Sequence, residues 1–222
     1  LKSINHHLDD MYVLSFEKKD KYLTNASSLD ATLDALQIKW IPLRFSEEYG
    51  VFGKVFDLIK MHVIALKTII RNNINIVHAR GHIAGETAAL LKYFLPIKVI
   101  FDCRGLWAEE KINKGGWNLE NPLDRFQYKL FKKIEKKVFT KADHIIVLTN
   151  KVIKKIKDNF KISNNKLTVI PCCADFNHFT ILEPAEVNNF KIDQGIDSNA
   201  LILGYLGSIG NMYRFHDYIK LV

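Results

Sequence analysis

Short apolar runs alternate with amphipathic segments along most of the chain. Seven of these runs predict β-strands, and they lie at residues 11–16, 38–45, 74–79, 98–103, 144–148, 167–171 and 201–207. Most of them are continuously apolar rather than alternating with polar residues, which is typical of strands whose two faces are both buried. The pattern therefore indicates strands inside a sheet that other elements cover.

The segments between the strands have a helical pattern. In the longest of them, the residues of one face recur at intervals of three and four, as Val55, Leu58, Ile59, His62, Leu66 and Ile69. This spacing matches an α-helix with one apolar face. Strands and helices in alternation predict an α/β fold, in which a parallel, Rossmann-like sheet carries helices on both faces.

The segment from 180 to 199 interrupts this alternation. It contains Pro184, Gly195 and several polar residues, and it has little periodicity. The apolar run after it begins a new strand-turn-helix unit. We therefore expect a first domain at 1–180, a linker at 181–199 and the start of a second Rossmann-like domain at 200–222.

Composition narrows the class of protein. Of the 222 residues, 48% are hydrophobic, which excludes a disordered chain. Lys and Arg number 32 and Asp and Glu 24, so the net charge is +8 and favours an anionic partner such as a nucleotide, a sugar phosphate, a nucleic acid or an anionic lipid surface. Three cysteines are too few for a disulfide framework and lack the spacing of a zinc site, which favours a reducing, cytoplasmic compartment.

The ends of the chain and its longest apolar runs add two expectations. No apolar run reaches the roughly 18 residues that span a bilayer, and no secretion signal opens the chain. The sequence opens on Leu1 rather than Met, and it stops at Val222 soon after a new apolar run has begun. We therefore expect the chain to be a fragment of a longer protein.

The end of the third predicted strand carries three polar side chains, His78, Arg80 and His82, and the helix after them has small residues in its early turns. Parallel α/β sheets bind ligands at the carboxyl ends of their strands, and the free amides of a helix N-terminus attract anions. Two interpretations stay open: an anion site, or a histidine in the core with Arg80 in an ion pair. The two histidines lack a third ligand, so we expect no metal site.

The fourth predicted strand ends in Asp102, which Cys103, Arg104 and Gly105 follow. A carboxylate at the end of an apolar strand is partly desolvated by neighbouring loops, and this setting suits a general base. Arg104 could pair with Asp102 or with a substrate phosphate, and an Asp–Arg pair that only shapes the loop is the structural alternative. Cys103 is disfavoured as a nucleophile because a neighbouring anion raises the pKa of a thiol.

Several common nucleotide and hydrolase motifs are missing from the sequence. It contains no Gly-x-Gly-x-x-Gly, no P-loop and no Gly-x-Ser-x-Gly. Their absence disfavours nicotinamide dehydrogenases, P-loop nucleotidases and common serine hydrolases.

Much of the positive charge lies in a predicted helix at 122–141 and in the helix after it. One face of the first helix is apolar, with Leu123, Phe126, Leu130, Ile134 and Val138. Its other side carries Lys129, Lys132, Lys133, Lys136, Lys137 and Lys141, and the second helix adds Lys151, Lys154, Lys155 and Lys157. These lysines form either a solvated face or a surface for anionic lipid headgroups. Nucleic acid is disfavoured because no recognition motif or aromatic platform accompanies them.

Four segments together resemble the N-terminal half of group 1 (family 4) glycosyltransferases. They are Ile76-Val77-His78-Ala79-Arg80, Phe101-Asp102-Cys103-Arg104-Gly105, Ala142-Asp143-His144-Ile145-Ile146-Val147-Leu148-Thr149, and the stretch 167–179. In the last of these, Ile170-Pro171 is followed by Asp175 and Phe179 at the spacing of the family, although Cys172 and Cys173 occupy a turn that more often holds Asn and Gly. The resemblance covers roughly residues 10–218, and 204–210 looks like the first strand and turn of a second domain.

The resemblance implies a GT-B architecture, in which the first Rossmann-like domain holds the acceptor and the second holds the nucleotide-sugar donor. Enzymes of this family retain the anomeric configuration, generally without a metal or another cofactor. Carried over to this sequence, the resemblance implies that Asp102 is catalytic. The residues implied on the acceptor side are His78, Arg80, His82, Arg104 and Glu109, and those on the donor side are Gly207, Ser208 and Gly210.

Two departures from the family bear on activity. The family has a further strand and a glycine-rich loop before the strand at 11–16, and it continues beyond Val222 with most of the donor domain. We therefore expect a fragment of a retaining glycosyltransferase of polysaccharide or glycolipid biosynthesis that is inactive alone. It would act in the cytoplasm or at the inner face of a membrane, with Lys129, Lys132, Lys133, Lys136 and Lys137 as membrane-facing candidates. The alternatives are a GT-B nucleotide-sugar epimerase and a noncatalytic membrane- or saccharide-binding module.

Overall fold

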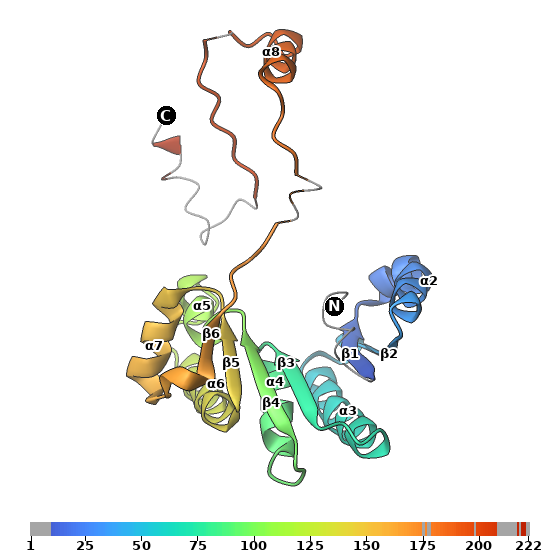
Figure 1. Cartoon of the computed structure of the whole chain (residues 1–222). Coiled ribbons are helices and arrows are strands. Elements are labelled where there is room, and N and C mark those ends of the chain that lie inside the picture. Colours follow the sequence, from blue (N-terminus) through green and yellow to red (C-terminus); the bar gives the residue numbers. More distant parts are fainter. Residues whose placement is uncertain are drawn as a thin grey trace. The chain divides into compact units, whose positions relative to one another are not determined.

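The computed structural model describes residues 10–174, 176, 179–197, 199–207, 217, 219 and 220 (Figure 1). The strands are β1 (Met11–Glu17), β2 (Ile38–Arg44), β3 (Ile76–Arg80), β4 (Lys98–Cys103), β5 (His144–Val147) and β6 (Leu167–Val169). The α-helices are α2 (Lys19–Ala35), α3 (Gly50–Arg71), α4 (His82–Leu91), α5 (Trp107–Asn113), α6 (Pro122–Lys141), α7 (Asn150–Phe160) and α8 (Pro184–Asp193). Short 3-10 helices lie at Glu47–Tyr49 and Asn164–Lys166.

The strands form two sheets, with the orders β1-β2 and β3-β4-β5-β6. The pairs β1–β2 and β5–β6 are parallel, and helices alternate with the strands along the chain, so the predicted α/β class is confirmed. Two compact units divide the described residues. The first contains those up to Phe101 together with Lys141–Asp143, and the second contains Asp102–Thr140 and those from His144 onward.

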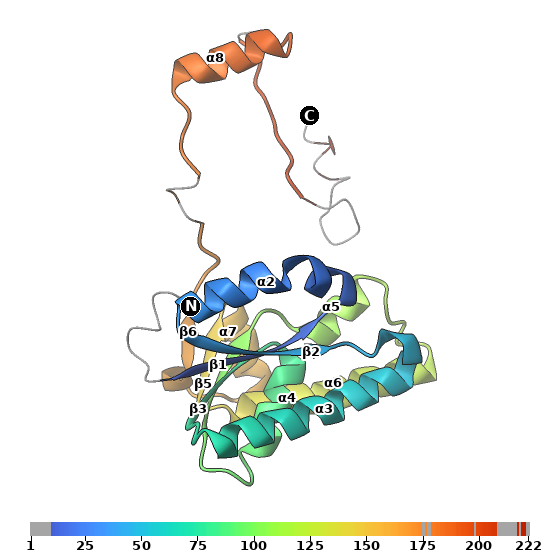
Figure 2. The ribbon, with the colours of Figure 1, turned by 90° about the vertical axis from the view of Figure 1, so that its right-hand side faces the viewer.

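In the first unit, β1 and β2 pair along their whole length, from Met11 opposite Ile38 to Glu17 opposite Arg44. The indole Nε1 of Trp40 donates to Ser15 Oγ at 2.8 Å and ties the two strands together through their side chains. Helix α2 packs on β2 and runs alongside the pair (Figure 2). The order strand, helix, parallel strand is the basic unit of an α/β fold.

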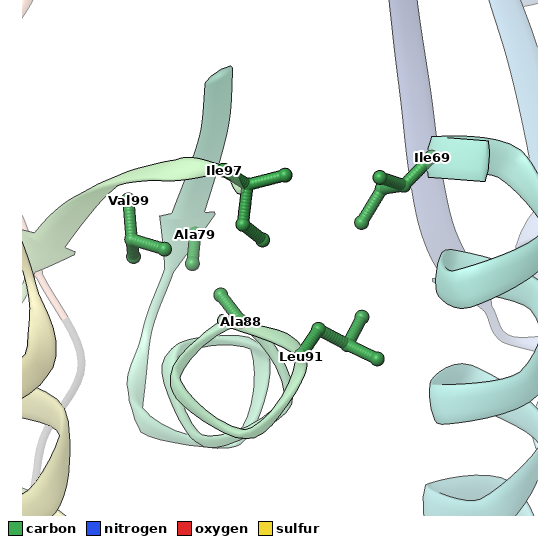
Figure 3. Packing of buried hydrophobic residues seen from close by; sticks show 6 residues of the cluster. All are labelled: Ile69, Ala79, Ala88, Leu91, Ile97 and Val99. Atoms are coloured by element: carbon green, nitrogen blue, oxygen red, sulfur yellow. The ribbon is translucent and has the colours of Figure 1, made fainter. Parts of the chain in front are cut away.

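The core of the first unit lies where α4 packs on β3. Its buried residues come from two helices, two strands and the turn before β4, and they are Ile69, Ala79, Ala88, Leu91, Ile97 and Val99 (Figure 3). Ala79 on β3 and Ala88 on α4 are small, which lets the helix backbone approach the sheet. The small residues expected early in this helix therefore have a packing role.

Helix α3 has the expected period and the expected apolar face, but most of that face is not buried. Val55, Ile59 and Leu66 are exposed, and the side of α3 that is buried carries Gly53, Asp57, Met61 and Ile69. The exposed apolar row of α3 consists of Phe52, Val55, Phe56, Ile59, Val63, Leu66 and Ile70. The reason is that α3 packs on α4 and on the 3-10 helix at Glu47–Tyr49 with its other side.

The break between the two sheets falls between β1 and β3. In a doubly wound sheet, the first strand lies between the second strand and the fourth. A strand before β1, which the family resemblance implies, would occupy this break. The presence of that strand stays a prediction, as do the three domain ranges.

In the second unit, β5 and β6 pair in parallel and α7 packs on both. Phe139, Ile145, Val147 and Ile156 are completely buried there. Helix α7 begins at Thr149, whose Oγ1 accepts a hydrogen bond from the amide of Val152, and such a cap satisfies one of the free amides of the first turn. The threonine of the Ala-Asp-x-Ile-Ile-x-x-Thr segment is therefore a helix cap.

The aspartate of the same segment, Asp143, holds the start of β4. Its Oδ2 accepts hydrogen bonds from the ammonium of Lys92 and from the amide of Val99, the latter at 2.7 Å, while its own amide donates to Val99 O at 2.9 Å. Partial burial favours the neutral acid, but the bonds from Lys92 and Val99 outweigh it and lower the pKa of Asp143.

The end of the chain differs from expectation in two respects. The segment expected to be a linker contains α8, which begins with Pro184 and a capping box between Glu183 and Glu186. Local capping makes this helix, and none of its residues is buried. The predicted strand at 201–207 is wrong, because a strand needs a partner and none of the described strands pairs with this segment.

Replacing the Asp143 carboxylate is expected to destabilise the fold. Asp143→Asn should lower the free energy of unfolding in urea at pH 7 by about 2 kcal/mol, since hydrogen bonds to a charged, half-buried carboxylate are lost. A carboxyl whose pKa is lowered by folding stabilises the native state above its unfolded pKa of about 3.9, and this contribution disappears as the pH falls through the folded pKa.

The difference between Asp143→Asn and the parent chain should therefore shrink in acid. The matched control is Lys98→Gln, which removes an exposed ammonium 3.8 Å from Asp143 Oδ1. This control should change stability by no more than about 0.5 kcal/mol. Equal urea midpoints for Asp143→Asn and the parent chain would contradict the role assigned to Asp143.

Candidate functional site

The end of β3 presents two of the predicted site residues to solvent. His78 and Arg80 are exposed, whereas Ala79 between them is buried in the core of the first unit. Alternate residues of a strand point to opposite faces, so His78 and Arg80 share the exposed face. Gly81 follows with a φ of +80°, which a glycine adopts without strain, and serves as the N-cap of α4.

His82 opens helix α4 and is half-buried. Its ring meets the ring of Phe101 edge-on, with 5.4 Å between centroids, and its Nε2 is buried. No side chain caps the start of α4, so the amides of its first turn lack the partner that a serine or aspartate would provide. His78, Arg80 and His82 thus gather at one end of β3, in the first unit.

Asp102 lies in the second unit, at the end of β4, and only 8% of it is exposed. Arg104 Nη1 is 3.9 Å from Asp102 Oδ1, and Arg104 Nη2 donates to Cys172 Sγ at 3.8 Å. Arg104 therefore joins the loop after β4 to the turn after β6. A Cβ atom on Gly105 would lie 1.9 Å from Glu110 Oε1, so any larger residue at this position would displace that carboxylate.

Cys103 is a poor nucleophile. Its side chain is buried, and burial raises the pKa of the thiol to about 12, with smaller contributions from the carboxylates of Glu135 and Asp102. Burial is the larger cause, and the sequence indicated only the smaller one, the neighbouring charge. Because the thiolate is the reactive form of cysteine, Cys103 is inert at neutral pH.

Glu109 and Lys132 are joined in the second unit. Lys132 Nζ donates to Glu109 Oε1 at 2.6 Å and also to Glu135, which is completely buried on α6. Burial disfavours the ammonium, but the two hydrogen bonds outweigh it and raise the pKa of Lys132. Lys132 therefore neutralises a buried carboxylate and fastens α5 to α6, so a fully solvated side chain does not describe it. Its place among the membrane-facing candidates stays a prediction.

The other lysines of α6 keep closer to expectation. Lys129, Lys133 and Lys136 are exposed, and Lys137 is half-buried. The apolar face predicted for α6 is buried only in the second half of the helix, because Leu123, Phe126 and Leu130 are exposed. Membrane contact by any of these lysines stays a prediction.

The predicted donor-side residues lie at the end of the described chain. Gly207 is exposed in a segment without regular structure. Ser208 and Gly210 lie outside the described residues, as does Asp175 of the family segment. The donor-binding role of the three residues therefore stays a prediction.

Among the described residues, no group of three or more histidine, cysteine, aspartate or glutamate side chains is placed to hold a metal ion. Within the same part of the chain, no helix is both long enough and apolar enough to cross a bilayer.

Sequence reasoning missed two features of the second unit. Glu135 is a buried carboxylate, and the only sign of it in the sequence was one glutamate three residues after Lys132 within a run of lysines. Trp107, Trp117 and Phe131 form an aromatic cluster, with 4.3 Å between the ring centroids of Trp107 and Phe131. Both features hold α5 and α6 together.

Alkylation should distinguish the three free cysteines. With iodoacetamide at neutral pH, the exposed Cys172 and Cys173 should react while the native chain protects Cys103. Mass spectrometry should then show two adducts on the native chain and three in denaturant. Three adducts formed at one rate on the native chain would contradict the burial of Cys103.

Solved structures share the fold at low sequence identity. HepE (Alr3699) from Anabaena, in complex with UDP and glucose, matches 95% of this chain and 57% of its own with a TM-score of 0.56 and 11% identity. The same protein with UDP matches 87% of this chain and 44% of its own, with a TM-score of 0.51 and 10% identity. A glycosyltransferase from Rickettsia africae has a TM-score of 0.49 and 18% identity, over 86% of this chain and 51% of its own. The chain thus spans about half the length of these GT-B structures.

A comparison with curated proteins found no match. The family model described as Glycosyltransferase Family 4, however, matches residues 25–178, which is more than half of the chain. The α/β fold with parallel strands and the likeness to half of the GT-B structures agree with this match. The chain belongs to glycosyltransferase family 4.

Proposed function

We propose that this chain is the acceptor-side part of a retaining glycosyltransferase. The enzyme would transfer a sugar from a nucleotide-sugar donor to a saccharide or lipid-linked acceptor in polysaccharide or glycolipid biosynthesis. The observation that carries the proposal is the buried carboxylate of Asp102 at the end of β4, in a chain of family 4. The UDP and glucose in the HepE complex support a nucleotide sugar as donor.

In this proposal Asp102 is the catalytic residue. Its carboxylate would accept a hydrogen bond from the attacking hydroxyl of the acceptor and hold that hydroxyl on the face of the sugar from which the diphosphate departs. The new glycosidic bond would form as the bond from the sugar to the diphosphate breaks, and the proton of the hydroxyl would pass to the departing diphosphate oxygen. Burial keeps water away from this carboxylate, and β4 fixes its position from behind. Arg104, at 3.9 Å, would balance the negative charge of Asp102 before the acceptor binds.

The remaining proposed roles follow from charge and exposure. His78, Arg80 and His82 would bind acceptor hydroxyls or an acceptor phosphate at the end of β3, where both His78 and Arg80 are exposed. Glu109 would contribute to acceptor binding through Oε2, which accepts no hydrogen bond within the described residues. Its other oxygen, Oε1, accepts a hydrogen bond from Lys132. Cations and helix amides would stabilise the charge that develops on the departing nucleoside diphosphate.

The donor would bind to residues of a second domain, beginning with Gly207, Ser208 and Gly210. Glycines there would let backbone amides approach the diphosphate. Because the chain spans about half of the GT-B structures it resembles, we propose that it does not complete transfer alone. Contact with an anionic membrane is part of the same proposal, since a lipid-linked acceptor lies at a bilayer surface.

The role of Asp102 can be tested in the gene product that contains this chain. Asp102→Asn should lower the turnover number for sugar transfer by about 10²-fold or more, because the negative charge that holds the acceptor hydroxyl is lost while the shape of the side chain is kept. The thermal unfolding transition should stay unchanged. Asp158→Asn, at an exposed position of α7, is the matched control and should retain full turnover. Full turnover by Asp102→Asn would remove this carboxylate from the mechanism.

The 222-residue chain alone should show no transfer. It can be incubated with a radiolabelled nucleotide sugar and with saccharide or lipid-linked acceptors, and the products separated by chromatography. We expect no labelled product above that of a heat-denatured sample, because donor binding needs residues beyond this chain. Labelled product from the native chain would show that it carries a complete active site.

A further inference from the structure

The first half of α6 is apolar on a side that no other described element covers. Leu123, Phe126 and Leu130 follow the spacing of a buried helix face, yet they are 72%, 66% and 44% exposed. The helix is held by its other side, where Phe131 packs on Trp107 and on Trp117. The exposed row therefore belongs to a firmly packed helix.

Lysines lie directly beside this apolar row. At 100° per residue, Lys129 and Lys133 fall on the same flank of α6 as Phe126, and both are exposed. Helix α7, which contacts α6 through Phe139 and Phe160, adds exposed lysines at positions 151, 154 and 155.

The acidic side chains of α6 do not cancel these charges. Glu135 is buried against Lys132, and Asp124 accepts a hydrogen bond from the amide of Asn118 at 2.9 Å. The exposed part of α6 beside the apolar row is therefore strongly cationic.

We propose that the first half of α6 docks on an anionic membrane, with Leu123, Phe126 and Leu130 inserted among the headgroups and Lys129 and Lys133 at the phosphates. Lysines alone would give a salt-sensitive contact with any polyanion, and an apolar row alone would suit an apolar partner. Their combination on one helix is typical of helices that lie in the membrane interface. The docking deepens the membrane contact proposed above, and it stands whether or not the chain supports sugar transfer.

Helix α3 carries a longer exposed apolar row, but a role within the fold accounts for it. This helix connects β2 with β3, and a helix that connects parallel strands packs its apolar side on the sheet. The row on α3 thus fits the break between the pair β1-β2 and strand β3. It provides a matched control, because Phe56 on α3 is 59% exposed, close to Phe126.

The test is sedimentation of the 222-residue chain with vesicles. Vesicles of phosphatidylcholine with about one-third phosphatidylglycerol should bind the chain, and pure phosphatidylcholine vesicles should bind it at least tenfold more weakly. Phe126→Ser combined with Leu130→Ser should weaken binding to the anionic vesicles about tenfold or more. Lys129→Gln and Lys133→Gln should each weaken it roughly fivefold and reduce its sensitivity to salt.

The control Phe56→Ser should bind as the parent chain does, and far-UV circular dichroism with thermal unfolding should show that every variant is folded. The proposal is overturned if no vesicles bind, if pure phosphatidylcholine binds equally well, or if Phe56→Ser loses binding. Unchanged binding by the Phe126/Leu130 variant would reduce the contact to charge and also overturn it. Size-exclusion chromatography tests a different outcome. If the parent chain forms dimers and the Phe126/Leu130 variant does not, the apolar row is a self-association face instead.

Discussion

The hydrogen bonds of Asp143 are the constraint on which the described site depends. They hold the amide of Val99 and the ammonium of Lys92 at the beginning of β4, and Asp102 is the penultimate residue of this strand. A six-residue strand is short and stiff, so fixing its start restricts where the side chain of Asp102 can lie. Residues of the segments that carry the family resemblance can therefore have structural roles. Asp143 and Thr149 hold the backbone through hydrogen bonds, and the catalytic role of Asp102 stays a proposal.

The sequence located the strands well because continuous apolar runs report burial directly. Six of the seven expected strands exist, and α6 has the predicted ends, with Pro122 favouring its first turn. The seventh run, at 201–207, failed because pairing requires a second strand that local sequence does not specify. The exposure of apolar residues on α3 and α6 has a related reason. Periodicity reveals an apolar stripe such as Phe52 to Ile70, but it does not reveal whether another element covers the stripe.

The sequence was enough to predict that the candidate site residues lie at strand ends. It was not enough to predict which of their side chains contact one another. Parallel topology brings Arg80 and Asp102 to carboxyl ends of strands, which a pattern of strands and helices already implies. The contact of Arg104 with Cys172 joins residues that lie 68 positions apart, and the bond from Lys132 to Glu109 spans 23. No local pattern encodes such pairs. A lysine that neutralises a buried carboxylate has the same sequence signature as a solvated one.

The positive charge of the chain consequently has two physical meanings. Lys92 and Lys132 are held by carboxylates, and their charge is largely cancelled at short range. Lys129 and Lys133 are exposed beside an apolar row, where their charge acts on whatever approaches the surface. A net charge of +8 cannot distinguish these cases, because it counts both kinds equally. Only the exposed lysines add to the field that attracts an anionic surface, and their position next to Phe126 and Leu130 makes a lipid bilayer a better match than a soluble anion.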